Sequence, residues 1–137
     1  MNALRIVSLP DRFRLESRGW TFTPFNESPL AAGLSLDWAS FHTVSLEPGS
    51  IRGNHVHPRV TEWLFFCGGP FLVVWQDEGS EAILQKQIAD QQTFLVIPPR
   101  VKHAVKNTGK ALLYLVAFRS RADGPDEAET LATPLIS

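Results

Sequence analysis

Residues 49–62 read Gly49-Ser-Ile-Arg-Gly-Asn-His55-Val-His57-Pro-Arg-Val-Thr-Glu62, and this stretch decides both the fold and the candidate site. Side chains alternate along a strand, so His55 and His57 point to the same face. Glu62 follows the next turn, and His103 can join them from a distant strand. Three imidazoles and one carboxylate suit a divalent transition metal such as Zn, Mn, Fe, Co or Ni. The residues therefore predict a metal site in a β-structure and leave the identity of the ion open.

The composition indicates one small globular domain. The chain has 137 residues, 44% of them hydrophobic, which is enough for a single core. Its net charge of -1 provides no basic surface for nucleic acid. No signal peptide is evident, and no apolar run approaches the ~18 residues of a membrane span. The single cysteine, Cys67, excludes an internal disulfide, so we expect a cytoplasmic protein that contacts no membrane.

Short extended runs dominate the pattern along the chain. Alternating apolar residues between Pro, Gly, Asn and Asp turns predict strands over residues 20–25, 41–46, 52–57, 62–67, 71–76, 82–88, 93–97, 103–108 and 111–118. Many short strands at this spacing are typical of an all-β sandwich or barrel. We expect N-terminal strands and a loop over residues 1–39, the barrel over 40–119, and a polar C-terminal tail or strap over 120–137.

The histidine stretch resembles the first motif of the cupin superfamily. That motif places a glycine before His-x-His, a glutamate after it, and a second glycine further on. Gly49, His55, His57, Glu62 and Gly69 match it with every spacing kept. The resemblance implies a double-stranded β-helix, the jelly-roll barrel of the cupins, as a single domain. It also implies a homodimer.

The second cupin motif is matched in part. Pro98, His103 and Asn107 stand in register with it, whereas Gln92 and Arg100 occupy the positions of its two glycines. Those two turns are therefore expected to differ in shape. Cupins carry many unrelated chemistries on one barrel, so the resemblance predicts the fold and the metal more sharply than the reaction.

A narrower likeness concerns the element Arg52-Gly-Asn-His55. It is similar to the cupin domain of some capsule-biosynthesis nucleotide-sugar reductases, and to the 3,5-epimerases and 3,4-ketoisomerases of nucleotide-linked deoxysugars. This likeness favours a small-molecule substrate such as a carbohydrate. Some of those sugar enzymes lack a metal and use a histidine as base, and Glu62 could instead orient a histidine from outside the ligand set.

Three further residues are candidates for catalysis. His42 could act as a general base, although a histidine at a strand end is often only a surface residue. Tyr114 could donate a proton to an enolate, or it could be a core residue. Arg52 could hold a phosphate or carboxylate, or form a salt bridge at the rim. Strand parity assigns Trp63 and Trp75 to the face away from the metal.

Three classes of function remain open at this stage. A metal that polarises a carbonyl would support a keto-sugar epimerase or isomerase. An iron-bound form could be a dioxygenase on a small organic substrate. The barrel could also bind a small molecule without turning it over.

Overall fold

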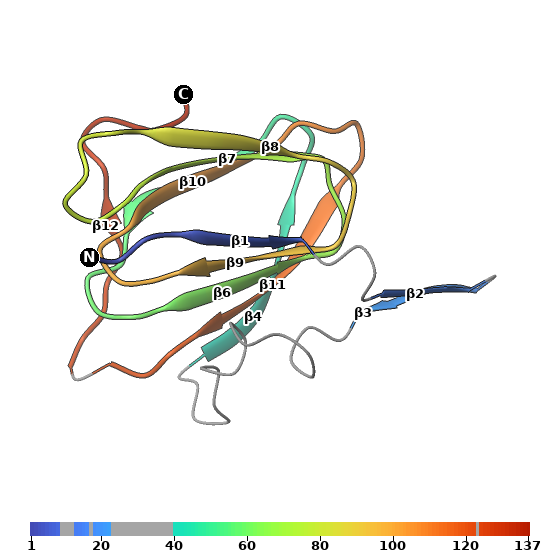
Figure 1. The fold of residues 1–137 in the computed structure, drawn as a ribbon, viewed down its shortest axis with the longest axis horizontal. Coiled ribbons are helices and arrows are strands. Elements are labelled where there is room, and N and C mark those ends of the chain that lie inside the picture. Colours follow the sequence, from blue (N-terminus) through green and yellow to red (C-terminus); the bar gives the residue numbers. More distant parts are fainter. Residues whose placement is uncertain (9–12, 17, 23–39, 123) are drawn as a thin grey trace.

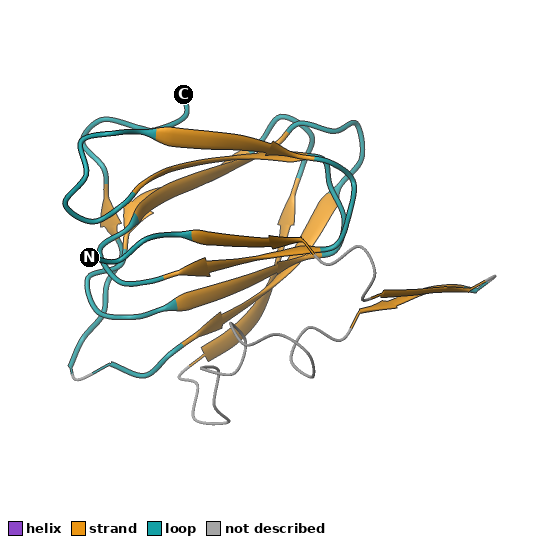
Figure 2. Ribbon diagram, viewed as in Figure 1, coloured by secondary structure: helices purple, strands orange, loops and turns teal. Residues whose placement is uncertain are grey.

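The fold is an all-β sandwich of two facing sheets (Figure 1). The computed structural model describes residues 1–8, 13–16, 18–22, 40–122 and 124–137. Its strands are β1 (Arg5–Ser8), β2 (Phe13–Glu16), β3 (Gly19–Phe22), β4 (Ser40–Leu46), β5 (Ile51–Val56), β6 (Glu62–Phe66), β7 (Phe71–Gln76), β8 (Leu84–Ile88), β9 (Thr93–Ile97), β10 (Lys102–Asn107), β11 (Leu113–Arg119) and β12 (Glu129–Thr130). Figure 2 shows only strands and loops in these residues, so the described chain contains no helix that could span a membrane.

The strand order is that of a jelly roll. One five-stranded sheet has the order β1-β9-β6-β11-β4 and the other has the order β12-β5-β10-β7-β8. Neighbours such as β1 and β9, or β5 and β10, are antiparallel although they lie far apart in the sequence. The chain therefore crosses repeatedly between the sheets, as jelly rolls do. The predicted all-β fold is confirmed.

The N-terminal region differs in detail from the predicted strands. β1 pairs with β9, and β2 forms a separate two-stranded ribbon with β3. The predicted strand over residues 20–25 corresponds to β3 as far as Phe22. The loop expected at the end of the N-terminal region falls on residues 23–39, which lie outside the described residues.

The core lies between the two sheets, because alternate residues of each strand point inward. This inner cluster includes Leu46, Phe66, Phe71, Val73, Ile88 and Leu95. A smaller outer cluster lies on the opposite face of β6, β9 and β11, and consists of Trp63, Phe65, Phe94 and Phe118. All five residues of β6 are buried, so this strand has no solvent-exposed face. A central strand packed on both faces holds any polar side chain at its end in a fixed position.

A β-bulge interrupts β5 where it pairs with β10. The register runs from His103 opposite His55 to Ala104 opposite Gly53, which leaves Asn54 as the extra residue. Gly53 has φ 96° and Asn54 has φ 56°, both in the left-handed region. A Cβ on Gly53 would lie 2.7 Å from the carbonyl oxygen of His103. Only glycine allows the two backbones to approach this closely.

The bulge changes which side chains of β5 point inward. Arg52 is opposite Val105, and His55 is opposite His103. Directly paired residues share a face, so Arg52 and His55 face the same side although they lie an odd number of residues apart. Strict alternation would have placed Arg52 on the far side of the sheet.

The C-terminal strap, defined here as residues 120–137 without the undescribed position 123, is bound to the edge of the second sheet. Within it β12 pairs with β5. Asn54 Oδ1 accepts hydrogen bonds from the backbone N–H groups of Leu135 at 2.8 Å and Ile136 at 3.1 Å. The Asn54 amide donates to the carbonyl of Ile136 at 2.9 Å. The extra residue of the bulge therefore anchors the end of the chain.

Candidate metal centre and substrate cavity

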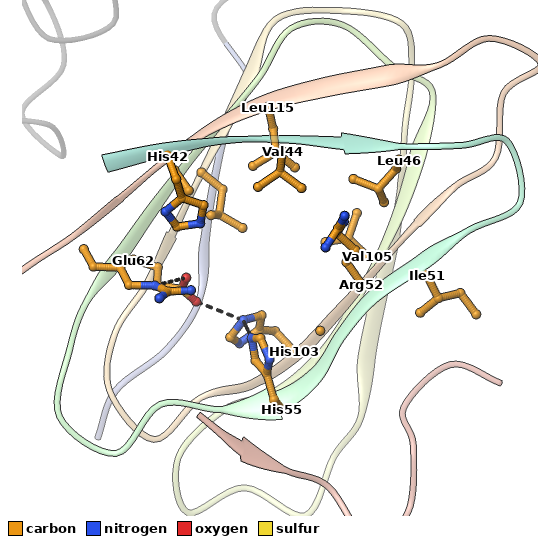
Figure 3. A pocket seen from close by; sticks show the side chains of 14 residues that line it. His42, Val44, Leu46, Ile51, Arg52, His55, Glu62, His103, Val105 and Leu115 are labelled. Atoms are coloured by element: carbon orange, nitrogen blue, oxygen red, sulfur yellow. Dashed lines mark hydrogen bonds and ion pairs between the residues drawn. The ribbon is translucent and has the colours of Figure 1, made fainter. Parts of the chain in front are cut away.

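The four predicted metal ligands meet at one end of the space between the sheets. His55 lies on β5, His57 follows it, Glu62 begins β6, and His103 lies on β10. His55 Nε2 is 3.0 Å from His103 Nε2. Glu62 Oε1 is 3.2 Å from His57 Nε2 and 3.2 Å from His103 Nε2. Figure 3 shows His55 and His103 side by side, with Glu62 facing them.

Two further contacts orient the histidine rings. His103 Nδ1 donates to the carbonyl oxygen of Val101 at 3.0 Å. That oxygen can only accept, so the Nε2 atom of neutral His103 carries a lone pair toward the cluster. His57 Nδ1 lies 2.8 Å from a carboxylate oxygen of Asp126, which belongs to the C-terminal strap. Both rings are thus held through the nitrogen that points away from the cluster.

Glu62 is also held from two sides. Its Oε2 accepts a hydrogen bond from Arg119 Nε at 3.1 Å, while its Oε1 points toward the histidines. The carboxylate is 4% exposed and comes from a strand that is buried throughout. Arg119 therefore fixes one oxygen and leaves the other toward the cluster.

The protonation states of two ligands suit metal binding. Burial lowers the pKa of the His55 imidazole, and the charge of His103 lowers it further, to about 4. Burial raises the pKa of the Glu62 carboxyl, but the approach of His103 and His57 outweighs it and holds that pKa well below its usual range. For His57, burial lowers the pKa, but the carboxylates of Glu62 and Asp126 raise it overall. At neutral pH His55 is therefore a neutral imidazole and Glu62 a carboxylate.

The donor atoms fit a divalent metal. The ligand atoms of His55, Glu62 and His103 all lie within 4.8 Å of one another. His57 Nε2 and Glu62 Oε1 are buried, and among the described residues neither makes a well-aligned hydrogen bond. A buried polar atom without a partner costs ~1–3 kcal/mol, and coordination of one cation by both atoms would remove that cost. A set of three nitrogens and one oxygen is typical of transition-metal sites.

A cavity of about 400 Å³ extends from this cluster into the barrel. Its walls are largely apolar, formed by Val44, Leu46, Ile51, Leu64, Val105, Leu115 and Ala117. Its polar lining comes from three members of the cluster, His55, Glu62 and His103, together with His42, Arg52 and Arg119. A few polar groups on an apolar wall are typical of a small-molecule site, and this volume is in the usual range for one.

Two of the three predicted catalytic residues line this cavity. His42 and Arg52 both do so, and Figure 3 shows them on opposite sides of it. Tyr114 does not line it, because it lies between the buried, inward-facing Leu113 and Leu115. Its side chain is 55% exposed on the outer face, so it is neither in the cavity nor in the core.

The parity assignment for the two tryptophans is correct for one and wrong for the other. Trp63 lies in the outer cluster, as expected. Trp75 is directly opposite His103 and packs against the inner cluster, so it shares the face of the predicted metal ligands. The alternation within β7 could not determine this face, because it depends on the register between β7 and β10.

Two residues of the site were not identified from the sequence. Arg119 comes directly after the predicted strand over residues 111–118 and has no motif around it, and Asp126 is one of several acidic residues in a polar segment. Both act on the cluster through side chains that lie more than fifty residues from their partners in sequence. No local pattern could have singled them out.

The spacing of these ligands on this barrel is that of the cupins. A family model described as Cupin matches residues 7–135. The chain belongs to the cupin family. None of the curated proteins searched matches the sequence of this cupin.

Several solved structures share the fold of this cupin. The dTDP-4-dehydrorhamnose 3,5-epimerase from Sulfolobus tokodaii has a TM-score of 0.67 and 14% identity, over 89% of this chain and 72% of that one. A 3,4-ketoisomerase from Helicobacter canadensis has a TM-score of 0.63 and 15% identity, over 88% and 85%. The capsular polysaccharide assembling protein CapF from Staphylococcus aureus has a TM-score of 0.61 and 18% identity, over 71% and 27%. This cupin thus spans about a quarter of the length of CapF, and at these identities the similarity shows the fold alone.

Proposed function

We propose that this cupin is a metal-dependent enzyme that isomerises or epimerises a keto-sugar or a similar carbonyl compound. The observation that carries the proposal is the cluster of three histidines and Glu62 at the end of a cavity of about 400 Å³, with His42 and Arg52 on its walls. Structures named as a sugar 3,5-epimerase and as a 3,4-ketoisomerase share the fold and support the same class of substrate.

The metal would be held by His55, His57, Glu62 and His103. When bound, it would supply a Lewis acid that polarises a substrate carbonyl. Arg119 orients Glu62 through its 3.1 Å hydrogen bond to Oε2, and the approach of His103 and His57 keeps the carboxyl ionised. The apolar wall of the cavity limits the access of water to the reacting carbons.

His42 is the residue proposed to move the proton. It lines the cavity from β4, on the opposite sheet from His55 and His103. Burial lowers its pKa, and the nearby charge of Arg119 lowers it further. The ring is therefore neutral at pH 7, so it can take the proton from the hydroxyl-bearing carbon next to the carbonyl and give it to the former carbonyl carbon. The hydroxyl proton passes to the former carbonyl oxygen, so the carbonyl moves by one position. Tyr114, on the outer face, has no part in this step.

Arg52 is proposed to bind the anionic part of the substrate. Its Nε donates to the carbonyl oxygen of Ser45 at 3.2 Å, which holds the guanidinium at the cavity. The remaining N–H groups of a guanidinium suit two oxygens of a phosphate or carboxylate. A nucleotide-linked sugar would present such an anion.

The metal is tested by elemental analysis of the purified protein. We expect near-stoichiometric metal in the wild type and its loss in His55→Ala and Glu62→Ala. Glu47→Ala, at an exposed position, is the control that should retain the metal. A wild-type protein that binds no transition metal on titration would remove the metal from the proposal.

The reaction is tested by solvent deuterium exchange with a panel of nucleotide-linked keto-sugars. We expect deuterium at the carbon next to the carbonyl during turnover. His42→Gln should slow the exchange at least ~100-fold, whereas Tyr114→Phe should leave it unchanged. No exchange across the panel would refute the proposed reaction, and oxygen uptake by the iron-loaded protein would then favour a dioxygenase.

The homodimer and the cytoplasmic location stay predictions. Light scattering of the purified protein would check the homodimer.

A further inference from the structure

One carboxylate of the C-terminal strap is built into the cluster. The Asp126 side chain is 9% exposed, and its Oδ2 lies 2.8 Å from His57 Nδ1. Its Oδ1 accepts the backbone N–H groups of Arg59 at 2.8 Å and Val60 at 3.1 Å. Each carboxylate oxygen thus has its own donors. Only one orientation of the carboxylate makes all of these hydrogen bonds.

This arrangement determines which nitrogen of His57 carries the proton in the neutral ring. An ionised carboxylate can only accept, so Nδ1 must donate to Asp126. Glu62 Oε1 also lies near the ring, 3.2 Å from Nε2, but among the described residues neither of these two atoms makes a hydrogen bond, whereas the 2.8 Å contact of Nδ1 with Asp126 is one. A neutral ring therefore keeps its proton on Nδ1 and presents the Nε2 lone pair to the centre of the cluster. A carboxylate that holds a histidine through the distal nitrogen is the arrangement that tunes metal-binding imidazoles.

We propose that Asp126 is a positioning residue, which holds neutral His57 as the Nδ1–H tautomer so that Nε2 can bind a metal. The metal half of this inference rests on the proposed function, whereas the tautomer is a property of the chain alone. The strap therefore completes the site from the far end of the sequence. It is anchored a second time at Asn54, the residue before His55, through the backbone of Leu135 and Ile136.

The decisive variant is Asp126→Asn. The carboxamide oxygen can still accept from the N–H groups of Arg59 and Val60, which places its NH₂ group where Oδ2 faced His57. An NH₂ group donates, so Nδ1 must become the acceptor and Nε2 must carry the proton. The strap stays anchored, but the metal-binding lone pair is lost. Asp126→Ala removes both the anchor and the orientation, so it cannot separate them.

The first measurement is metal affinity, by titration of the full-length apoprotein with Co²⁺ or Zn²⁺. We expect Asp126→Asn to weaken binding about 10- to 100-fold while the unfolding midpoint of the apoprotein stays close to that of the wild type. Glu127→Gln is the matched control, because it removes one charge from an exposed neighbour in the same strap. It should leave the affinity unchanged. Equal affinities for Asp126→Asn and the wild type would overturn the inference.

The second measurement needs no metal. Nitrogen NMR of the imidazole rings in alkaline buffer reports which nitrogen of His57 is protonated. We expect the Nδ1–H form in the wild type and the Nε2–H form in Asp126→Asn. An Nε2–H ring in the wild type, or the same tautomer in both proteins, would overturn the assignment. If the wild type binds no metal but shows the expected switch, the metal centre fails and the role of Asp126 in positioning His57 stands.

Discussion

The two ends of the space between the sheets are built from the same strands but have opposite chemistry. On β6, Glu62 lies at one end and Phe66 at the other. At the apolar end Phe66 stacks on Phe71 with ring centroids 3.9 Å apart, and both rings are fully buried. At the polar end, His57 and Glu62 each bury an atom that has no hydrogen-bond partner among the described residues.

The difference shows how the barrel combines a closely packed core with a cluster of buried polar atoms. Closely packed aromatic and aliphatic side chains stabilise the fold at the apolar end. Buried polar atoms without partners destabilise it at the polar end, unless a ligand binds them. Changes at the apolar end should therefore alter stability, and changes at the polar end should alter binding. Four substitutions test this contrast.

The largest effect is expected for Phe66→Ala at the apolar end. Loss of a fully buried ring from a stacked pair should lower the free energy of unfolding by about 3–5 kcal/mol. Denaturant unfolding measures this change. Phe41→Ala is the control, because that ring is 57% exposed on the outer face, and its cost should be much smaller. Equal losses in the two variants would contradict the contrast.

The next largest effect is expected for Asn107→Ala. The buried Asn107 amide donates to the carbonyls of Leu46 and Ala111, both at 2.9 Å, and its oxygen accepts from Gly109. Removal leaves these backbone groups without their partner and should cost about 2–4 kcal/mol in thermal or denaturant unfolding. The exposed Lys110→Ala in the same turn should be nearly neutral. A stable Asn107→Ala protein would show that these bonds are dispensable.

Gly53→Ala should lower both the stability of the fold and the metal affinity of the polar end. A Cβ there meets the carbonyl of His103 at 2.7 Å and also requires φ 96°, so we expect a loss of about 2 kcal/mol and weaker metal binding. Gly49→Ala is the matched control. It has φ 79° but open space around the added carbon, so it carries the backbone strain without the clash. If both variants lose the same stability and keep the same metal affinity, the close approach of β5 to β10 contributes neither to stability nor to metal binding.

The smallest effect is expected for Arg52→Gln. This side chain is exposed at the cavity, so we expect no change in stability and a loss of about 1.5 kcal/mol in binding of an anionic substrate. The readout is KM, or the affinity for a nucleotide-linked sugar. Arg5→Gln removes the same charge from an exposed position on β1 and should change neither quantity. An unchanged affinity in Arg52→Gln would place the anion elsewhere.

Local patterns predicted the fold and the residues that lie together in the cluster. The alternation of apolar residues predicts the strands of the barrel, because each inward side chain must be buried. The spacing of His55, His57 and Glu62 with a distant His103 predicts one cluster, and the structure brings these residues together. β1, β2 and β12 did not stand out among the predicted strands, since they are short and have few apolar residues.

What the sequence by itself determined is therefore the class of fold and the residues that form the cluster, because alternation and spacing are local properties of a strand. What only the tertiary structure decided depends on register and on contacts distant in sequence. The bulge at Asn54 directs Arg52 inward, and the pairing with β10 does the same for Trp75. The return of the chain end brings Asp126 to His57. The physical reason is that pairing between strands is determined by the packing of the whole barrel, which no single segment encodes.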